Sequence, residues 1–192
     1  MKIRIGLAIT GSFCTYDKIL KQIELLTQKE YEILPIFSYS VDPTDTRFFN
    51  AKDFKQKITE LTGHKPINTI SLAEPVGPQN LIDVLAVAPC TGNTLAKIAN
   101  AITDTPVLMT VKAHLRNNKP LVIGISTNDA LGLNLKNLGT LMSTKNIYFV
   151  PFCQDDSVKK PNSLIANFDL LESTILEALN GKQIEPVILT KY

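Results

Sequence analysis

Cysteine and histidine are scarce in this chain of 192 residues. The three cysteines, Cys14, Cys90 and Cys153, are odd in number and lie far apart. That spacing fits neither a disulfide framework nor a zinc site. The two histidines, His64 and His114, are equally isolated. We therefore expect neither a disulfide scaffold nor a structural metal ion.

An excess of charge of one sign is also lacking, because 20 basic and 18 acidic residues give a formal net charge of only +2. The basic residues are scattered, which argues against a nucleic-acid partner. No apolar run is long enough to span a bilayer, and the N-terminus lacks the cleavage site of a signal peptide. We therefore expect a cytoplasmic protein that binds neither nucleic acid nor membrane.

What the chain does contain is a regular alternation of apolar runs and amphipathic stretches. The expected strands are 3–9, 33–37, 67–72, 81–88, 121–125 and 147–152. The expected helices lie around 19–26, from the cap Asn50 to Gly63, and at 91–101, 105–116, 131–142 and 168–179. This alternation predicts an α/β fold with a doubly wound, mostly parallel sheet and helices on both faces. We expect one domain over 1–192, with 182–192 as a tail that adds an edge strand or reaches a neighbouring subunit.

Polar residues gather where the expected strands end. Ligands of such sheets bind outside the carboxyl ends of the strands. Neither a Gly-x-Gly-x-x-Gly run nor a Gly-Lys-Ser/Thr run is present, so the dinucleotide fingerprint and the P-loop are both missing. Backbone N–H groups at helix starts, together with hydroxyls, nevertheless suit a phosphate. The candidate segments are 10–14, 38–40, 88–94, 126–129 and 152–161.

Each of these polar side chains also has a simpler interpretation as a helix cap. Ser12 and Thr91 both stand where a helix begins, and Asp129 stands before the helix expected at 131–142. Asn93 is different, because its amide offers a planar heterocycle both a donor and an acceptor, which a cap does not need. The composition at 88–94 therefore favours a phosphate-bearing cofactor, while capping stays open for the individual hydroxyls.

The segment Thr10-Gly11-Ser12, the hydroxyl of Ser38 and the string from Ala88 to Asn100 together resemble the flavoprotein family of homo-oligomeric flavin-containing cysteine decarboxylases. The resemblance covers essentially the whole chain. It implies a Rossmann-like fold and an FMN cofactor bound between the subunits of a trimer-based assembly. The residues that it implies for FMN binding are Gly11, Ser12, Ser38, Pro89, Thr91, Gly92, Asn93, Thr94, Ser126 and Asn128.

Longer strings resemble one branch of this family, found in spore-forming bacteria; they lie at 14–17, 44–48, 125–134 and 146–166. The resemblance implies a sporulation protein of the mother cell. Together with an A subunit, it would oxidise a dihydrodipicolinate-type precursor to pyridine-2,6-dicarboxylate. The A subunit has a nicotinamide-cofactor-binding fold of its own, so NAD(P) could be bound by that partner.

Two departures from the wider family argue against cysteine decarboxylation. The decarboxylases carry a catalytic histidine shortly before the strand expected at 81–88, whereas 71–80 contains none. Their Pro-x-Met-Asn motif appears as Ser126-Thr127-Asn128, which keeps only the asparagine. A decarboxylase acting on a cysteine-derived peptide or pantothenate is therefore the least favoured of three hypotheses.

Oxidising a dihydropyridine ring removes a hydride and a proton, and a flavin is a competent hydride acceptor. Two substrate carboxylates call for cationic side chains, with arginine's bidentate fork preferred. Arg47 is the first candidate, and Arg116, Lys112 and the pair Lys159-Lys160 come next, although Arg116 and Lys112 are more simply surface charges of the helix expected at 105–116. Asp129 could take the ring proton. The alternative is a non-catalytic subunit that binds flavin or substrate and completes the site of the A subunit.

Overall fold

A computed structural model describes residues 2–29 and 31–190 of the chain. Its centre is a sheet with the strand order β2-β1-β3-β4-β7-β6, in which β5 also pairs with β4. Strands β1 to β5 pair in parallel, whereas β7 is antiparallel to both β4 and β6. The strands are β1 (Arg4–Ile9), β2 (Glu32–Phe37), β3 (Val84–Cys90), β4 (Leu121–Thr127), β5 (Ile147–Phe149), β6 (Phe152–Asp156) and β7 (Lys160–Ala166).

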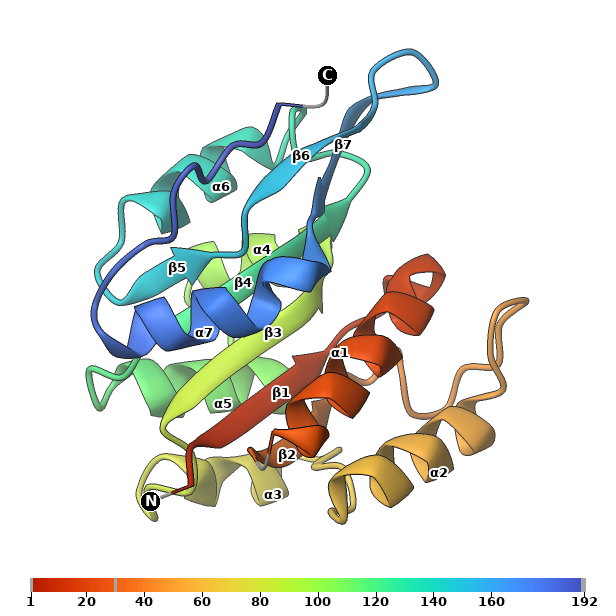
Figure 1. Cartoon of the computed structure of the whole chain (residues 1–192), viewed down its shortest axis with the longest axis vertical. Coiled ribbons are helices and arrows are strands. Elements are labelled where there is room, and N and C mark those ends of the chain that lie inside the picture. Colours follow the sequence, from red (N-terminus) through yellow and green to blue (C-terminus); the bar gives the residue numbers. More distant parts are fainter. Residues whose placement is uncertain (1, 30, 191–192) are drawn as a thin grey trace.

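Helices cover both faces of this sheet (Figure 1), which confirms the predicted α/β fold. One face carries α1 (Tyr16–Gln28), α2 (Ala51–Thr62) and α7 (Leu171–Leu179). The other carries α3 (Ile70–Ala73), α4 (Gly92–Ala99) and α5 (Pro106–Leu115), with α6 (Leu135–Met142) packed against α4. Short 3-10 turns are η1 (Phe13–Thr15), η2 (Glu74–Val76) and η3 (Phe168–Leu170).

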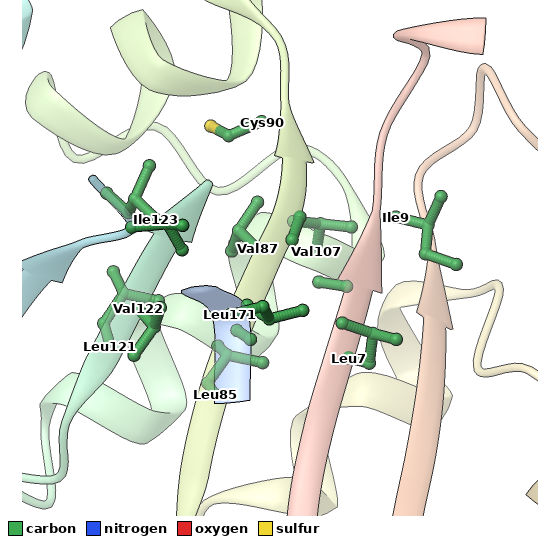
Figure 2. Close-up of a cluster of buried hydrophobic side chains, with 14 of the residues drawn as sticks. Leu7, Ile9, Leu85, Val87, Cys90, Val107, Leu121, Val122, Ile123 and Leu171 are labelled. Carbon is green, nitrogen blue, oxygen red and sulfur yellow. The ribbon is translucent and has the colours of Figure 1, made fainter. Parts of the chain in front are cut away.

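The core is centred on β3, whose seven residues are all buried. A strand covered on both faces needs apolar side chains at successive positions, and this explains its unbroken apolar run. In Figure 2, side chains from three neighbouring strands meet with one from a helix on each face of the sheet. These are Leu7 and Ile9 of β1, Leu85, Val87 and Cys90 of β3, Leu121, Val122 and Ile123 of β4, Val107 of α5 and Leu171 of α7.

Helix α2 shows how local sequence sets the boundaries of an element. The side chain of Asn50 accepts hydrogen bonds from the backbone N–H groups of Lys52 and Asp53. Gly63 ends the helix with a φ of 72°, a left-handed conformation that glycine adopts without steric cost. Both predicted ends of this helix are confirmed.

The strand predicted at 67–72 is wrong. Ile67 makes only an isolated bridge to Ile36, and the chain then enters α3. The physical reason is the cap at Thr69, whose hydroxyl accepts a hydrogen bond from the N–H of Leu72 and so favours a helical turn. The apolar run was too short for its composition to distinguish a strand from a buried helical turn.

The region after β5 also differs from the prediction. The strand expected at 147–152 ends at Phe149, and the segment between it and the helix expected at 168–179, for which no strand was predicted, forms the hairpin of β6 and β7. The tail lies beside β6, where Phe152 forms a parallel bridge with Ile188. Of the two alternatives expected for the tail, an edge strand or a contact with a neighbouring subunit, the described part of the tail matches the first. Its last positions, 191–192, lie outside the described residues.

Two further findings concern residues 2–29 and 31–190. Within these ranges, no helix combines the length and the apolar character that crossing a membrane requires. Nor does any group of three or more histidine, cysteine, aspartate and glutamate side chains in the same ranges have an arrangement that could hold a metal ion.

Candidate functional site

A cavity of about 650 Å³ lies at the carboxyl ends of β1, β3 and β4. Three segments at the ends of these strands line it: 11–14, 91–93 and 126–129. The remaining wall comes from the loop between β2 and α2 and from the β6–β7 hairpin. The volume is in the range of small-molecule and cofactor sites. Parallel strand order thus brings together segments that are more than a hundred residues apart in the chain.

The β1 and β4 segments are joined directly by their hydroxyl groups. The Oγ atoms of Ser12 and Ser126 lie 2.7 Å apart, at hydrogen-bond distance. The backbone N–H of Ser12 donates to the carbonyl of Thr10 at 2.8 Å, so the chain turns tightly at the end of β1. The side chain of Ser12 makes no capping hydrogen bond, and its interpretation as a helix cap is therefore wrong.

The buried hydroxyl of Thr10 holds the turn between β3 and α4. Its Oγ1 donates to the carbonyl of Pro89 at 2.7 Å and accepts from the N–H of Thr91 at 3.0 Å. The side chain of Thr91 in turn accepts from the N–H of Thr94 at 3.3 Å, which confirms Thr91 as the cap of α4. Pro89 and Thr94 thus shape the turn from behind and do not line the cavity.

The first turn of α4 presents Gly92 and Asn93 to the cavity, with the Asn93 side chain exposed. Gly92 packs closely against the segment after β4. A Cβ atom at this position would lie 2.5 Å from Asp129 Oδ1 and 2.5 Å from Thr127 Oγ1. Glycine is therefore required here by close approach, because any larger residue would push the start of α4 away from Asp129.

Asp129 is held in one orientation by hydrogen bonds to both carboxylate oxygens. Thr127 Oγ1 donates to Oδ1 at 2.5 Å, and Asn134 Nδ2 donates to Oδ2 at 2.7 Å. Asn134 is buried and accepts from Asn137 Nδ2 at 2.8 Å, while Asn137 Oδ1 lies 3.4 Å from Asn100 Nδ2. The residue at the N-cap of α6 is Asn134, and its side chain makes no capping hydrogen bond. Asp129 therefore does not cap α6, contrary to the simpler interpretation of the sequence.

This chain of amides was not predicted from the sequence. Asn134, Asn137 and Asn100 lie on or beside α4 and α6, where each resembles an ordinary polar helix position. The three-residue spacing of Asn134 and Asn137 is compatible with one helix face. That spacing does not distinguish a buried amide from an exposed one.

Two basic side chains line the cavity from opposite segments. Arg47 belongs to the loop between β2 and α2, and its guanidinium carbon lies 4.8 Å from the centroid of the Phe48 ring. Lys160 belongs to the hairpin, where its Nζ lies 2.7 Å from Asp155 Oδ2. The hydrogen bond to Asp155 raises the pKa of Lys160 above its usual value. Lys160 therefore carries a positive charge at neutral pH.

The cavity takes in most of the residues suggested by the sequence. Those that line it are Gly11, Ser12, Arg47, Thr91, Gly92, Asn93, Ser126, Asn128 and Asp129. Ser38, Pro89, Thr94 and Lys159 do not. Ser38 is buried behind the Gly11 turn, with its Oγ 2.9 Å from Ser40 Oγ. Lys159 stands in the hairpin turn, where its N–H donates to Asp156 Oδ1 at 2.9 Å.

The two cysteines near the site differ in environment. Burial raises the pKa of the Cys90 thiol, so this residue is an unreactive packing group. Cys14 is exposed and lines the cavity beside Phe13. Of the other lining residues, Phe13, Cys14 and Lys160 lie in the candidate segments 10–14 and 152–161, whereas Phe48 was not predicted as a site residue.

Comparison with known proteins places this geometry in a family. A model of the flavoprotein family matches residues 1–171. The chain is 51% identical over 189 residues to the B subunit of dipicolinate synthase from Bacillus subtilis (strain 168), covering 98% of this chain and 94% of that protein. The crystal structure of the corresponding B subunit of dipicolinate synthase from Bacillus halodurans C superimposes with a TM-score of 0.91 at 46% identity, over 100% of each chain.

A more distant structure, the FMN-dependent cysteine decarboxylase SpaF, has a TM-score of 0.66 at 22% identity, over 93% of this chain and 97% of that one. At this identity the likeness concerns the fold alone. The chain therefore belongs to the flavoprotein family. Within that family it groups with the B subunits of dipicolinate synthase, as the strings at 125–134 and 146–166 indicated.

Proposed function

We propose that this chain is an enzyme subunit that binds FMN in the cavity described above. Acting with an A subunit, it would oxidise a dihydrodipicolinate-type precursor to dipicolinate. The observation that supports this proposal is the meeting, in one cavity, of hydroxyl-rich strand ends with Arg47 and Lys160. Hydroxyl groups and a helix start suit a phosphate, and cationic side chains suit a dicarboxylate.

The donor set fits the phosphate of FMN. Ser12 and Ser126 present adjoining hydroxyls, and the start of α4 presents backbone N–H groups beside Asn93. Close packing at Gly92 seats the start of α4 directly against Asp129 and Thr127. When bound, FMN supplies an acceptor for a hydride. We assign Ser38, Pro89 and Thr94 the supporting role of fixing these segments from behind.

The chain's own residues would bind the substrate and remove its proton. Arg47 would pair with one carboxylate through its planar guanidinium. Oxidation of the dihydropyridine ring releases a hydride and a proton, and we assign the proton to the carboxylate of Asp129. Thr127 and Asn134 each occupy one acceptor position of that carboxylate. Since an ionised carboxylate has about four such positions, room for the proton remains.

A second candidate function is a subunit that binds flavin or substrate without performing the redox step, which would then occur in the A subunit with NAD(P). The exposure of Arg47, Phe48, Asn93 and Asn128 along the cavity favours a site that a neighbouring subunit completes. That neighbour would be the A subunit or another copy of this chain in a trimer-based homo-oligomer. The decarboxylase hypothesis has less support, because His64 and His114 both lie away from the cavity lining.

Two measurements test the proposal. Titration of the purified protein with FMN should give saturable binding and a perturbed flavin spectrum, and the absence of binding would remove the cofactor assignment. Oxidation of dihydrodipicolinate is then measured with this chain alone, with the A subunit alone, and with both. We expect the full rate only from the pair. A full rate from the A subunit alone would refute a catalytic role for this chain.

A further inference from the structure

Lys160, rather than its neighbour Lys159, reaches the cavity, because the two residues differ in their place on the hairpin. Lys159 belongs to the turn and its N–H is bound to Asp156. Lys160 is the first residue of β7 and lines the cavity, where its ammonium group meets Asp155. Of the two neighbouring lysines, only Lys160 therefore lines the cavity.

The ion pair of Lys160 with Asp155 is easily exchanged. The two side chains are 59% and 27% exposed, at an N–O distance of 2.7 Å. Ion pairs that are open to solvent to this degree contribute little net stability, because water screens them and two long side chains lose freedom. A substrate carboxylate that enters the cavity can therefore replace Asp155 as the partner of Lys160 at small cost.

Lys160 and Arg47 approach the cavity from different segments. Figure 1 shows the loop between β2 and α2 and the β6–β7 hairpin projecting as separate arms beyond the sheet. The cavity lining includes Arg47 from the first arm and Lys160 from the second, together with the aromatic rings of Phe13 and Phe48. Two cations on separate arms, with aromatic surface between the strand ends and the loop, match a flat ring that carries two carboxylates.

We propose that Lys160 is a specificity-determining residue that binds the second carboxylate of the substrate while Arg47 binds the first. Asp155 then holds the Lys160 ammonium group at the cavity until the substrate arrives. This inference rests on the proposed function, since it concerns the same site and the same dicarboxylate. It adds that the site selects ring compounds with two carboxylates over those with one, and that this selection depends on Lys160.

The test compares two ligands on four proteins. Pyridine-2,6-dicarboxylate and pyridine-2-carboxylate are titrated by calorimetry into the FMN-loaded wild type and into the variants Lys160→Ala, Lys160→Arg and Lys159→Ala. Losing one charge-assisted contact should weaken dicarboxylate binding about tenfold or more. Monocarboxylate binding should change less than about threefold, because Arg47 still provides its contact. Lys160→Arg should restore dicarboxylate binding, and Lys159→Ala should behave as wild type.

Four results would overturn the inference. Equal losses for both ligands in Lys160→Ala would indicate a general effect on the site, and equal losses in Lys159→Ala would indicate a diffuse charge effect of the hairpin. Unchanged dicarboxylate binding in Lys160→Ala would remove Lys160 from the site while leaving the proposed function intact. A wild type that binds neither FMN nor the dicarboxylate would refute the proposed function and this inference together.

Discussion

Replacing Gly92 with alanine tests the close contact between the start of α4 and the segment after β4. The added Cβ would lie 2.5 Å from Asp129 Oδ1, 2.5 Å from Thr127 Oγ1 and 2.8 Å from Asn134 Nδ2. All three atoms belong to one hydrogen-bonded cluster, so none can move without lengthening a bond to the carboxylate. Overpacking of this kind costs about 1–3 kcal/mol.

We therefore expect Gly92→Ala to lower the free energy of unfolding by about 2 kcal/mol. For a chain of this length, that corresponds to a fall in Tm of roughly 4–8 °C. The same substitution should weaken FMN binding, because α4 is displaced at the point where its N–H groups face the cavity. Thermal unfolding followed by circular dichroism and titration with FMN measure the two effects.

Gly139→Ala is the matched control. Gly139 lies within α6, and a Cβ atom there would meet nothing within 4 Å. Alanine is a better helix former than glycine, so this variant should gain about 0.5–1 kcal/mol and bind FMN as the wild type does. If Gly92→Ala proved as stable as Gly139→Ala and bound FMN normally, the close packing deduced around Asp129 would be refuted.

Three further predictions concern charge and polar contacts. Burial lowers the pKa of His114 to about 4. The unfolded chain then binds more protons between pH 4 and about 6.5, so stability falls as the pH drops through this window, by about 3 kcal/mol at pH 4. Urea unfolding should show that His114→Gln loses this contribution to the pH dependence, whereas His64→Gln, on the surface, keeps it. Asn134→Leu removes a donor from Asp129 and should cost about 1–3 kcal/mol of stability, measured by the same unfolding assay; an unchanged midpoint would contradict the buried amide chain. Arg47→Ala should raise the KM of the paired enzyme for the dicarboxylate about tenfold or more, and an unchanged KM would exclude Arg47 from the site.

Local signals in the sequence were sufficient for much of the fold. The cap and stop of α2 were predictable because Asn50 and Gly63 act through short-range backbone bonds. The buried strand β3 was predictable because a strand covered on both faces must be apolar throughout. The hairpin of β6 and β7 was not, since its side chains are half exposed and its pairing with β4 depends on tertiary contacts.

Some features of the candidate site could also be predicted from the sequence, and others could not. Strand-end hydroxyls such as Ser12 and Ser126 converge because parallel strands end at one edge of the sheet, which the strand pattern already implies. The difference between Lys159 and Lys160 depends on the register of a hairpin, and a shift of one residue reverses which side chain faces the cavity. The buried amides Asn134 and Asn137 depend on how α6 packs against α4, and a single sequence carries no periodic signal for that contact.

Direct titration of the purified chain with FMN tests the central claim most directly. The cavity between the ends of β1, β3 and β4 should bind one FMN per chain. Asn93→Ala should weaken that binding while leaving the free energy of unfolding within about 0.5 kcal/mol of the wild type. Failure of the wild type to bind FMN, in the presence or absence of the A subunit, would contradict the account.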